Sequence, residues 1–180
     1  MCARRCIGNS QPDETTQGTT VILTVSIADL KTSGQRGDTI VTHALGSCLG
    51  ITIYDPVAAV GGMLHAMLPD SSIDPKKGLE SPFMFVDTGL PRLFKDCYKL
   101  GADKTRLIVK VAGGATSKAN LEDDYFQIGK RNFVMLRKML WKNSVLLKSY
   151  DVGGCDSRTM SLELSTGDVL LKMNGAVRKL

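Results

Sequence analysis

The stretch VTHALGSCLGITIYDPVAAVGGMLHAML, residues 41–68, decides how this sequence is interpreted. Its β-branched and apolar runs on both sides of Asp55-Pro56 are typical of two strands joined by a turn, because proline presets the backbone angle φ at the second turn position. The same stretch holds Cys48 and both histidines of the chain, His43 and His65. It therefore carries part of the fold and the candidate chemistry together.

A hairpin through this stretch is expected to bring Cys48 and His65 close to each other. With residues 55–58 as a four-residue loop, Cys48 falls directly opposite His65. Directly opposed residues on one face have Cβ atoms about 4.5–5.5 Å apart, so a thiol and an imidazole there can reach each other. A register shift of one residue would instead send the two side chains to opposite faces.

Cys48 has two interpretations. A cysteine at the start of a strand is usually a small, inert hydrophobic residue of the core. A nucleophile needs a base, access for substrate and donors for a developing oxyanion, and the small residues Gly46 and Ser47 leave room for these. His65 is the predicted base in that case, and His43, which precedes Cys48 across the bend at Gly46, is the rival base.

The rest of the chain predicts an α+β or a layered α/β fold, because hairpins are mixed with two helices between strands. Strands are expected at 21–30, 39–46, 48–54, 59–68, 105–115, 144–154, 158–165 and 168–175. Helices are expected at 83–101, with Pro91 causing a kink or a late start, and at 127–143. Residues 31–38, 69–82 and 116–126 are expected to be loops. The apolar side chains of 127–143 expected to face the core are Ile128, Val134, Leu136, Met139 and Leu140.

Length and composition suit one domain, over residues 21–180, after a disordered tail at 1–20. The chain has 180 residues, of which 43% are hydrophobic. No apolar run approaches the roughly 20 residues of a membrane span, and the N-terminus lacks the apolar segment of a secretory signal. We therefore expect a cytoplasmic protein with no membrane insertion.

Charge and cysteine usage exclude two further classes. The net charge is +5, but the basic residues are dispersed and not interleaved with aromatic ones, which argues against a nucleic-acid partner. Five scattered cysteines argue against a disulfide framework, and the close pair Cys2 and Cys6 lacks the further ligands of a zinc site. No metal or cofactor is expected.

The segments THALGSCLGITIYDP (42–56) and GGMLHAMLPD (61–70) resemble the CheD family of chemoreceptor glutamine deamidases. FVDTGLPRLFKDCYKLGADKTRLIVKVAGGA, IGKRNFVMLRKML and LELSTGDVLLK extend the resemblance over roughly residues 21 to 173. It implies a layered α/β/α sandwich with mixed, largely antiparallel strands. It also implies hydrolysis of selected glutamines on methyl-accepting chemoreceptors to glutamate with release of ammonia, and in some members of receptor methyl esters.

The resemblance assigns roles to individual residues. It implies Cys48 as the nucleophile, His65 as its histidine and Thr42 as the catalytic threonine that orients the ring. Without the resemblance, Thr42 is better interpreted as an ordinary strand threonine. The implied partners are the cytoplasmic domain of a chemoreceptor as substrate and a CheC-type phosphatase as regulator.

Five further residues are candidates for the substrate site or the oxyanion hole. They are Ser47, Gly46, Gly113, Gly114 and Arg158. Tight turns are the alternative for the glycines, and a surface ion pair is the alternative for Arg158. Three rival hypotheses remain: another cysteine amidohydrolase or transamidase, a module that only docks a receptor or phosphatase, and a purely structural domain.

Overall fold

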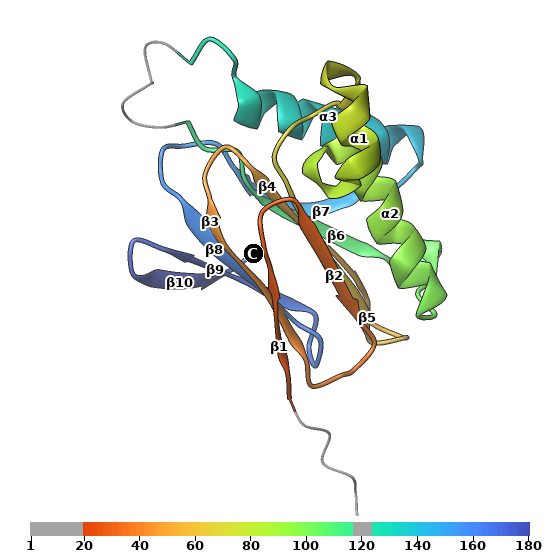
Figure 1. Ribbon diagram of the computed structural model, residues 1–180. Helices are drawn as coiled ribbons and strands as arrows, with labels where there is room; N and C mark the ends of the chain where they lie inside the picture. The colour runs from red at the N-terminus through yellow and green to blue at the C-terminus, as the bar shows by residue number, and fades with distance from the viewer. Residues whose placement is uncertain (1–19, 117–123) are drawn as a thin grey trace, which may run out of the picture.

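Two five-stranded β-sheets stack face to face, and the helices cover the outer face of one of them (Figure 1). The structure is a computed structural model that describes residues 20–116 and 124–180. The first sheet has the order β1 (Ile22–Val25), β3 (Thr39–Leu45), β8 (Arg158–Glu163), β9 (Asp168–Met173), β10 (Ala176–Lys179). The second sheet has the order β2 (Asp29–Ser33), β5 (Val60–Ala66), β4 (Leu49–Asp55), β6 (Ile108–Gly113), β7 (Leu147–Val152).

The strands are mixed but mainly antiparallel, which confirms the predicted α/β class. Only the β1–β3 and β6–β7 pairs are parallel within the described ranges; the other neighbours are antiparallel. The expected hairpin between the last two predicted strands is present as β8–β9, which Glu163 and Asp168 close. The sequence prediction missed β10, a short strand whose residues are all exposed.

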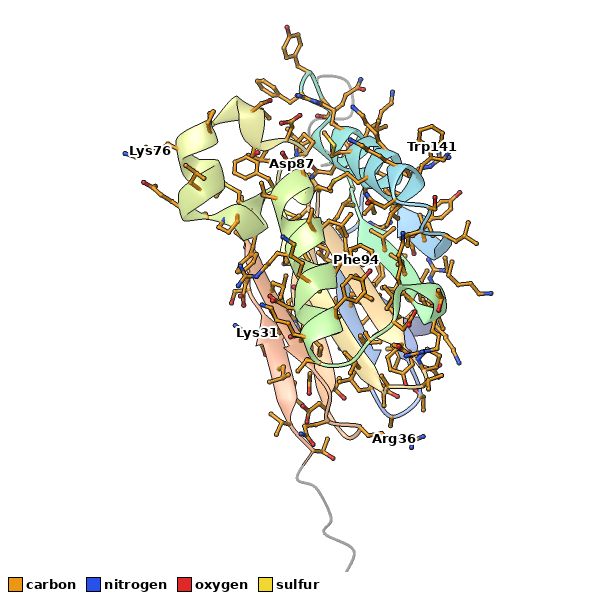
Figure 2. All side chains as sticks on the ribbon, turned by 90° about the vertical axis from the view of Figure 1, so that its right-hand side faces the viewer. Lys31, Arg36, Lys76, Asp87, Phe94 and Trp141 are labelled. Atoms are coloured by element: carbon orange, nitrogen blue, oxygen red, sulfur yellow. The ribbon has the colours of Figure 1, made fainter. Side chains whose placement is uncertain are left out.

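The helices form a single layer on the second sheet. They are η1 (Ser71–Ile73), α1 (Pro75–Glu80), η2 (Pro82–Met84), α2 (Val86–Lys99), η3 (Lys104–Arg106) and α3 (Ile128–Lys142). Figure 2 faces this layer and shows Asp87 and Phe94 on α2 and Trp141 on the exposed side of α3. Pro91 is the sixth of the fourteen residues of α2. The helix therefore starts before the proline, and the predicted late start is wrong.

The layer order differs from the α/β/α sandwich that the resemblance implied. The second sheet is the middle layer, and every residue of β4 and β5 is buried. The layer on its other side is the first sheet, not helices. Strand β8 alternates buried and half-buried residues, the pattern of a sheet with one face on the core and one toward solvent.

Each interface between layers has its own hydrophobic core. Leu49, Ile51 and Ile53 of β4 pack toward α2 and α3. Tyr54 and Met63 belong to the core between the two sheets. Since successive side chains of a strand point to opposite faces, the even residues of β4 and the odd residues of β5 face the first sheet.

The predicted strand 21–30 is in fact two strands in different sheets. A turn at 26–28 separates β1 from β2, with Ala28 in the left-handed region at φ 55°. The backbone N–H of Ser26 donates to the Asp29 carboxylate across this turn. The β-branched pattern runs through the turn without a break, so it concealed the crossing from the first sheet to the second.

Two other local predictions are wrong. The expected loop 69–82 contains η1, α1 and the start of η2, because Asp74 caps α1 by accepting from Lys77 N–H and Pro75 begins it. Val134, expected in the core, is 58% exposed, since the buried face of α3 is made by other residues. Those residues are Gly129, Asn132, Leu136 and Leu140. The predicted disordered tail, except residue 20, lies outside the described residues.

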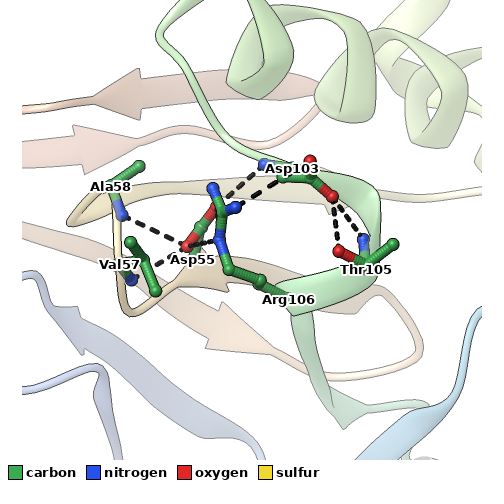
Figure 3. Close-up of polar contacts among 6 residues, drawn as sticks. All are labelled: Asp55, Val57, Ala58, Asp103, Thr105 and Arg106. Carbon is green, nitrogen blue, oxygen red and sulfur yellow. Dashed lines mark hydrogen bonds and ion pairs between the residues drawn. The ribbon is translucent and has the colours of Figure 1, made fainter.

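Asp55, the last residue of β4, fixes the turn between β4 and β5 (Figure 3). Its carboxylate accepts hydrogen bonds from the backbone N–H groups of Val57 and Ala58 and from that of Asp103. It also forms an ion pair with Arg106, at 2.8 Å. Burial would raise the pKa of Asp55, but the hydrogen bonds from Arg106 and the backbone hold it well below its usual range.

Candidate active site

Cys48 and His65 lie on the same face of the second sheet, in a register two residues away from the predicted one. The turn between β4 and β5 comprises residues 56–59, so Gly50 is opposite His65. The turn comes later than predicted because Asp55 continues β4 and its carboxylate binds the N–H groups that follow. A shift of two residues preserves the face, so Cys48, directly before β4, is a diagonal neighbour of His65.

His65 meets Thr42 across the space between the two sheets. The ring is fully buried, and its Nδ1 lies 2.7 Å from Thr42 Oγ1. Thr42 Oγ1 also donates to the backbone carbonyl of Val25, at 2.8 Å. A threonine hydroxyl has one proton, and a carbonyl can only accept, so Oγ1 must accept from Nδ1–H of His65.

This hydrogen-bond chain fixes the tautomer of the neutral ring. With the proton on Nδ1, the lone pair of His65 lies on Nε2. Nε2 is buried, and no atom of the described residues forms a hydrogen bond with it. The Cys48 side chain packs against the core between the sheets, which is the side that His65 also faces.

Burial favours the neutral forms of both groups. It raises the pKa of the Cys48 thiol, an effect only partly opposed by the backbone N–H of the same residue. It lowers the pKa of the His65 imidazole. The resting pair is therefore a thiol and a neutral imidazole, with the basic nitrogen of the ring on the side of the sheet where the thiol lies.

The turn that carries Cys48 is held by the end of β6. The N–H of Gly114 donates to the Cys48 carbonyl, and the N–H of Ala115 donates to the Gly46 carbonyl, both at 2.8 Å. Gly113 has φ 116°, and a Cβ there would lie 2.2 Å from the Cys48 carbonyl oxygen. Gly113 and Gly114 thus permit a close backbone approach beside Cys48.

A cleft of about 510 Å³ adjoins this turn. Of the predicted site residues, Gly46 and Ser47 line it. The others, Cys48, His65, Thr42, Gly113, Gly114 and Arg158, do not. The other lining residues are Ala115, Thr116, Asp124, Phe126, Ile128, Cys155 and Ser157.

Arg158 is buried and directly follows Ser157, which lines the cleft. It is 5% exposed, and its guanidinium pairs with Asp151 at 2.9 Å and donates to the carbonyls of Gly153 and Asp156. The alternative given above, a surface ion pair, is therefore wrong, because Arg158 is buried where it pairs with Asp151. His43, the rival base, is exposed, and its ring lies 3.4 Å from Thr159 Oγ1, so it faces away from Cys48.

The family model described as CheD chemotactic sensory transduction matches residues 67–173. This chain belongs to the CheD family. The resemblance found in the sequence is thereby confirmed.

Other CheD proteins are similar over most of this chain. A protein of Syntrophus aciditrophicus named probable chemoreceptor glutamine deamidase CheD 1 is 53% identical, over 84% of this chain and 93% of its own. Similarly named proteins of Solibacter usitatus and Pyrococcus abyssi are 48% and 44% identical, over 87% and 76% of this chain and 91% and 83% of their own. A solved structure, NMB0706 of Neisseria meningitidis (family-model DUF152), has a TM-score of 0.43 and 9% identity over 74% of this chain and 64% of its own.

The sequence prediction missed the lining residues of the cleft from Ala115 to Ser157, and it also missed a buried polar contact of the Cys48 turn. Asn132 of α3 is fully buried and contacts the turn before Cys48. A polar residue on the apolar face of a predicted helix was the available signal. Residues 20–116 and 124–180 hold no cluster of metal-binding side chains and no helix long and apolar enough to cross a membrane.

Proposed function

We propose that this chain hydrolyses the side-chain carboxamide of selected glutamines on methyl-accepting chemoreceptors, giving glutamate and ammonia. Three relatives that cover at least three quarters of the chain carry the name chemoreceptor glutamine deamidase. The observation that best supports this chemistry is the hydrogen-bond chain from His65 through Thr42 to the Val25 carbonyl. It leaves the basic nitrogen of a buried imidazole unoccupied on the face of the sheet that also carries Cys48.

The first half of the reaction forms a thioester. His65 Nε2 accepts the thiol proton while Cys48 Sγ attacks the carboxamide carbon, and the carbonyl electrons move to the oxygen. The backbone N–H groups of Ser47 and Cys48 are the proposed donors to this oxyanion. The imidazolium then returns the proton to the nitrogen as the C–N bond breaks, so that ammonia leaves.

The second half regenerates the enzyme. A water molecule attacks the thioester while His65 Nε2 takes its proton, and the C–S bond breaks to release glutamate. The thiolate then recovers the proton from the ring. Because the resting pair is neutral, proton transfer is coupled to attack, and we expect Sγ and Nε2 to approach each other when substrate fills the cleft.

Thr42 orients the base in this scheme. It holds Nδ1–H and thereby keeps Nε2 unprotonated, the role of the third residue in a catalytic triad. Gly46 contributes to the wall of the cleft. Gly113, Gly114 and Arg158 act indirectly, by fixing the backbone around the cleft.

The proposed partners follow from family membership. The cytoplasmic domain of a chemoreceptor is the proposed substrate, a CheC-type phosphatase is the proposed regulator, and the cytoplasm is the proposed location. The same nucleophile is suited to hydrolysis of receptor methyl esters, with methanol in place of ammonia as the leaving group. No cofactor is required by these steps.

The test is mass spectrometry of a receptor cytoplasmic fragment incubated with the wild-type protein, Cys48→Ala and His65→Ala. His43→Ala and Cys97→Ala are the matched controls, since they change the same residue types away from the cleft. We expect conversion of glutamine to glutamate, with ammonia release, in the wild type and both controls only. Conversion by Cys48→Ala would refute the mechanism. If the wild type binds the fragment without converting it, the chain is a docking module. Methanol release, measured alongside ammonia release, distinguishes hydrolysis of methyl esters from deamidation.

A further inference from the structure

Asn132 connects the two chain segments that carry the proposed nucleophile and base. Its side-chain Nδ2 donates one hydrogen bond to the Ser47 carbonyl, at 3.1 Å, and another to the Met67 carbonyl, at 2.8 Å. Ser47 directly precedes Cys48, and Met67 follows His65 by two positions. One amide group thus uses both of its protons to tie the Cys48 turn to the end of β5.

This arrangement is costly for stability. Asn132 is fully buried on the face of α3 that also holds Leu136 and Leu140. Its Oδ1 is buried as well and has no hydrogen-bond partner among the described residues. Asparagine is a weak helix former, and an unpaired buried acceptor carries a desolvation penalty. Stability alone would favour an apolar residue here, so the two donated hydrogen bonds point to a positional role.

Backbone contacts and the side chain of Asn132 together fix the position of the Cys48 turn. Backbone N–H groups of Gly114 and Ala115 hold it along the edge of β6. Asn132 holds it from the helical layer and is also bonded to the segment that carries the base. The β4–β5 ladder also joins the two segments, through its terminal pair Leu49 and Ala66. Asn132 extends this link beyond the end of the ladder, to Ser47 and Met67.

We propose that Asn132 is a positioning residue that sets the separation between Cys48 and His65. This inference rests on the proposed function, in which the two side chains exchange a proton. Without the amide, the carbonyls of Ser47 and Met67 lose their shared donor and the turn shifts relative to β5. A displacement of about 1 Å at a reacting centre costs about 10²-fold in rate, and we expect a loss of that order in kcat with little change in KM.

The experiment compares Asn132→Asp and Asn132→Leu with the wild type. Asp has nearly the same shape but no N–H donors, and Leu suits the apolar face of α3. Asn143→Asp is the matched control. Asn143 caps the C-terminal end of α3 and donates to a backbone carbonyl, that of Met139 at 2.8 Å, but it is exposed. The melting temperature, kcat and KM on a receptor fragment, and the pH profile of Cys48 alkylation by iodoacetamide are measured for each.

We expect at least one Asn132 variant to remain folded while its kcat falls. Its alkylation profile should move to that of His65→Ala, whereas Asn143→Asp matches the wild type. A folded variant with wild-type kcat and profile would overturn the proposal. Unfolding of both Asn132 variants would also overturn it, by assigning the residue a purely structural role. Because alkylation needs no receptor, the profile tests the inference even if the proposed deamidation fails.

Discussion

Replacing Thr42 by valine separates the chemical role of this residue from its packing. Valine fills the space of threonine but has no hydroxyl, so Nδ1–H of His65 and the Val25 carbonyl lose the partners they have at 2.7 and 2.8 Å. Each buried group left unpaired costs about 1–3 kcal/mol, and we expect about 2–4 kcal/mol in total. For a chain of this size that corresponds to a melting temperature lower by about 5–15 °C.

The effect on activity should be larger than the effect on stability. Nothing holds the proton on Nδ1 in Thr42→Val, so Nε2 ceases to be a reliable base, and loss of general base catalysis costs about 10²–10⁴-fold. Thr42→Ser keeps the hydroxyl and loses one buried methyl group, which costs about 1 kcal/mol. We therefore expect Thr42→Ser to keep a rate close to that of the wild type.

The assay is ammonia release from a receptor fragment, run well below the melting temperature of both variants, with thermal unfolding followed in parallel. Near-normal turnover by Thr42→Val would refute the assignment of the tautomer. Equal loss of activity in Thr42→Ser would show that the methyl group, and hence packing, is what matters at this position.

Three further predictions follow from the same geometry. Burial lowers the pKa of His65, so below about pH 6.5 the unfolded chain binds more protons than the folded one. The free energy of unfolding measured by urea titration should therefore fall with decreasing pH, and His65→Gln should weaken that dependence. Asp55→Asn should lower the denaturation midpoint much more than Asp96→Asn, because Asp55 is a buried carboxylate at a hairpin turn and Asp96 pairs near the surface. Gly113→Ala should lower kcat, because a Cβ at this position would lie 2.2 Å from the backbone carbonyl oxygen of Cys48. The control is Gly101→Ala, at φ 101° with nothing within 4 Å, which should cost only about 1–2 kcal/mol of stability.

The β-branched and hydrophobic pattern of the sequence was sufficient to predict the strands that carry the candidate site, but not the register in which they pair. Cys48 and His65 were correctly placed on one face because alternation along β4 and β5 survives a shift of two residues. The shift itself depends on Asp55, which the pattern assigned to the turn. Its contacts with Asp103 and Arg106 come from residues about fifty positions away, and no local signal reports them.

The position of Thr42 was predictable only by resemblance. Its partner His65 belongs to the other sheet, and the turn at 26–28 that connects the two sheets is not visible in the β-branched pattern. Asn132 was missed for a related reason. A helix that buries one asparagine among leucines is recognisable, but the carbonyls it binds are found only in three dimensions.

The edge position of β1 suggests how the proposed base, His65, is switched on and off. β1 is a four-residue strand at the edge of the first sheet, and its Val25 carbonyl terminates the hydrogen-bond chain that orders the imidazole. Segments with few buried contacts open locally at a lower free-energy cost than the whole molecule, and three of the four residues of β1 are not buried. When β1 detaches transiently, Thr42 loses the Val25 carbonyl and no longer orients the ring of His65, while the rest of the fold stays intact. Hydrogen exchange at the backbone amides of Thr24 and Val25 should therefore report how often β1 opens, and hence the fraction of molecules in which the proposed base is oriented.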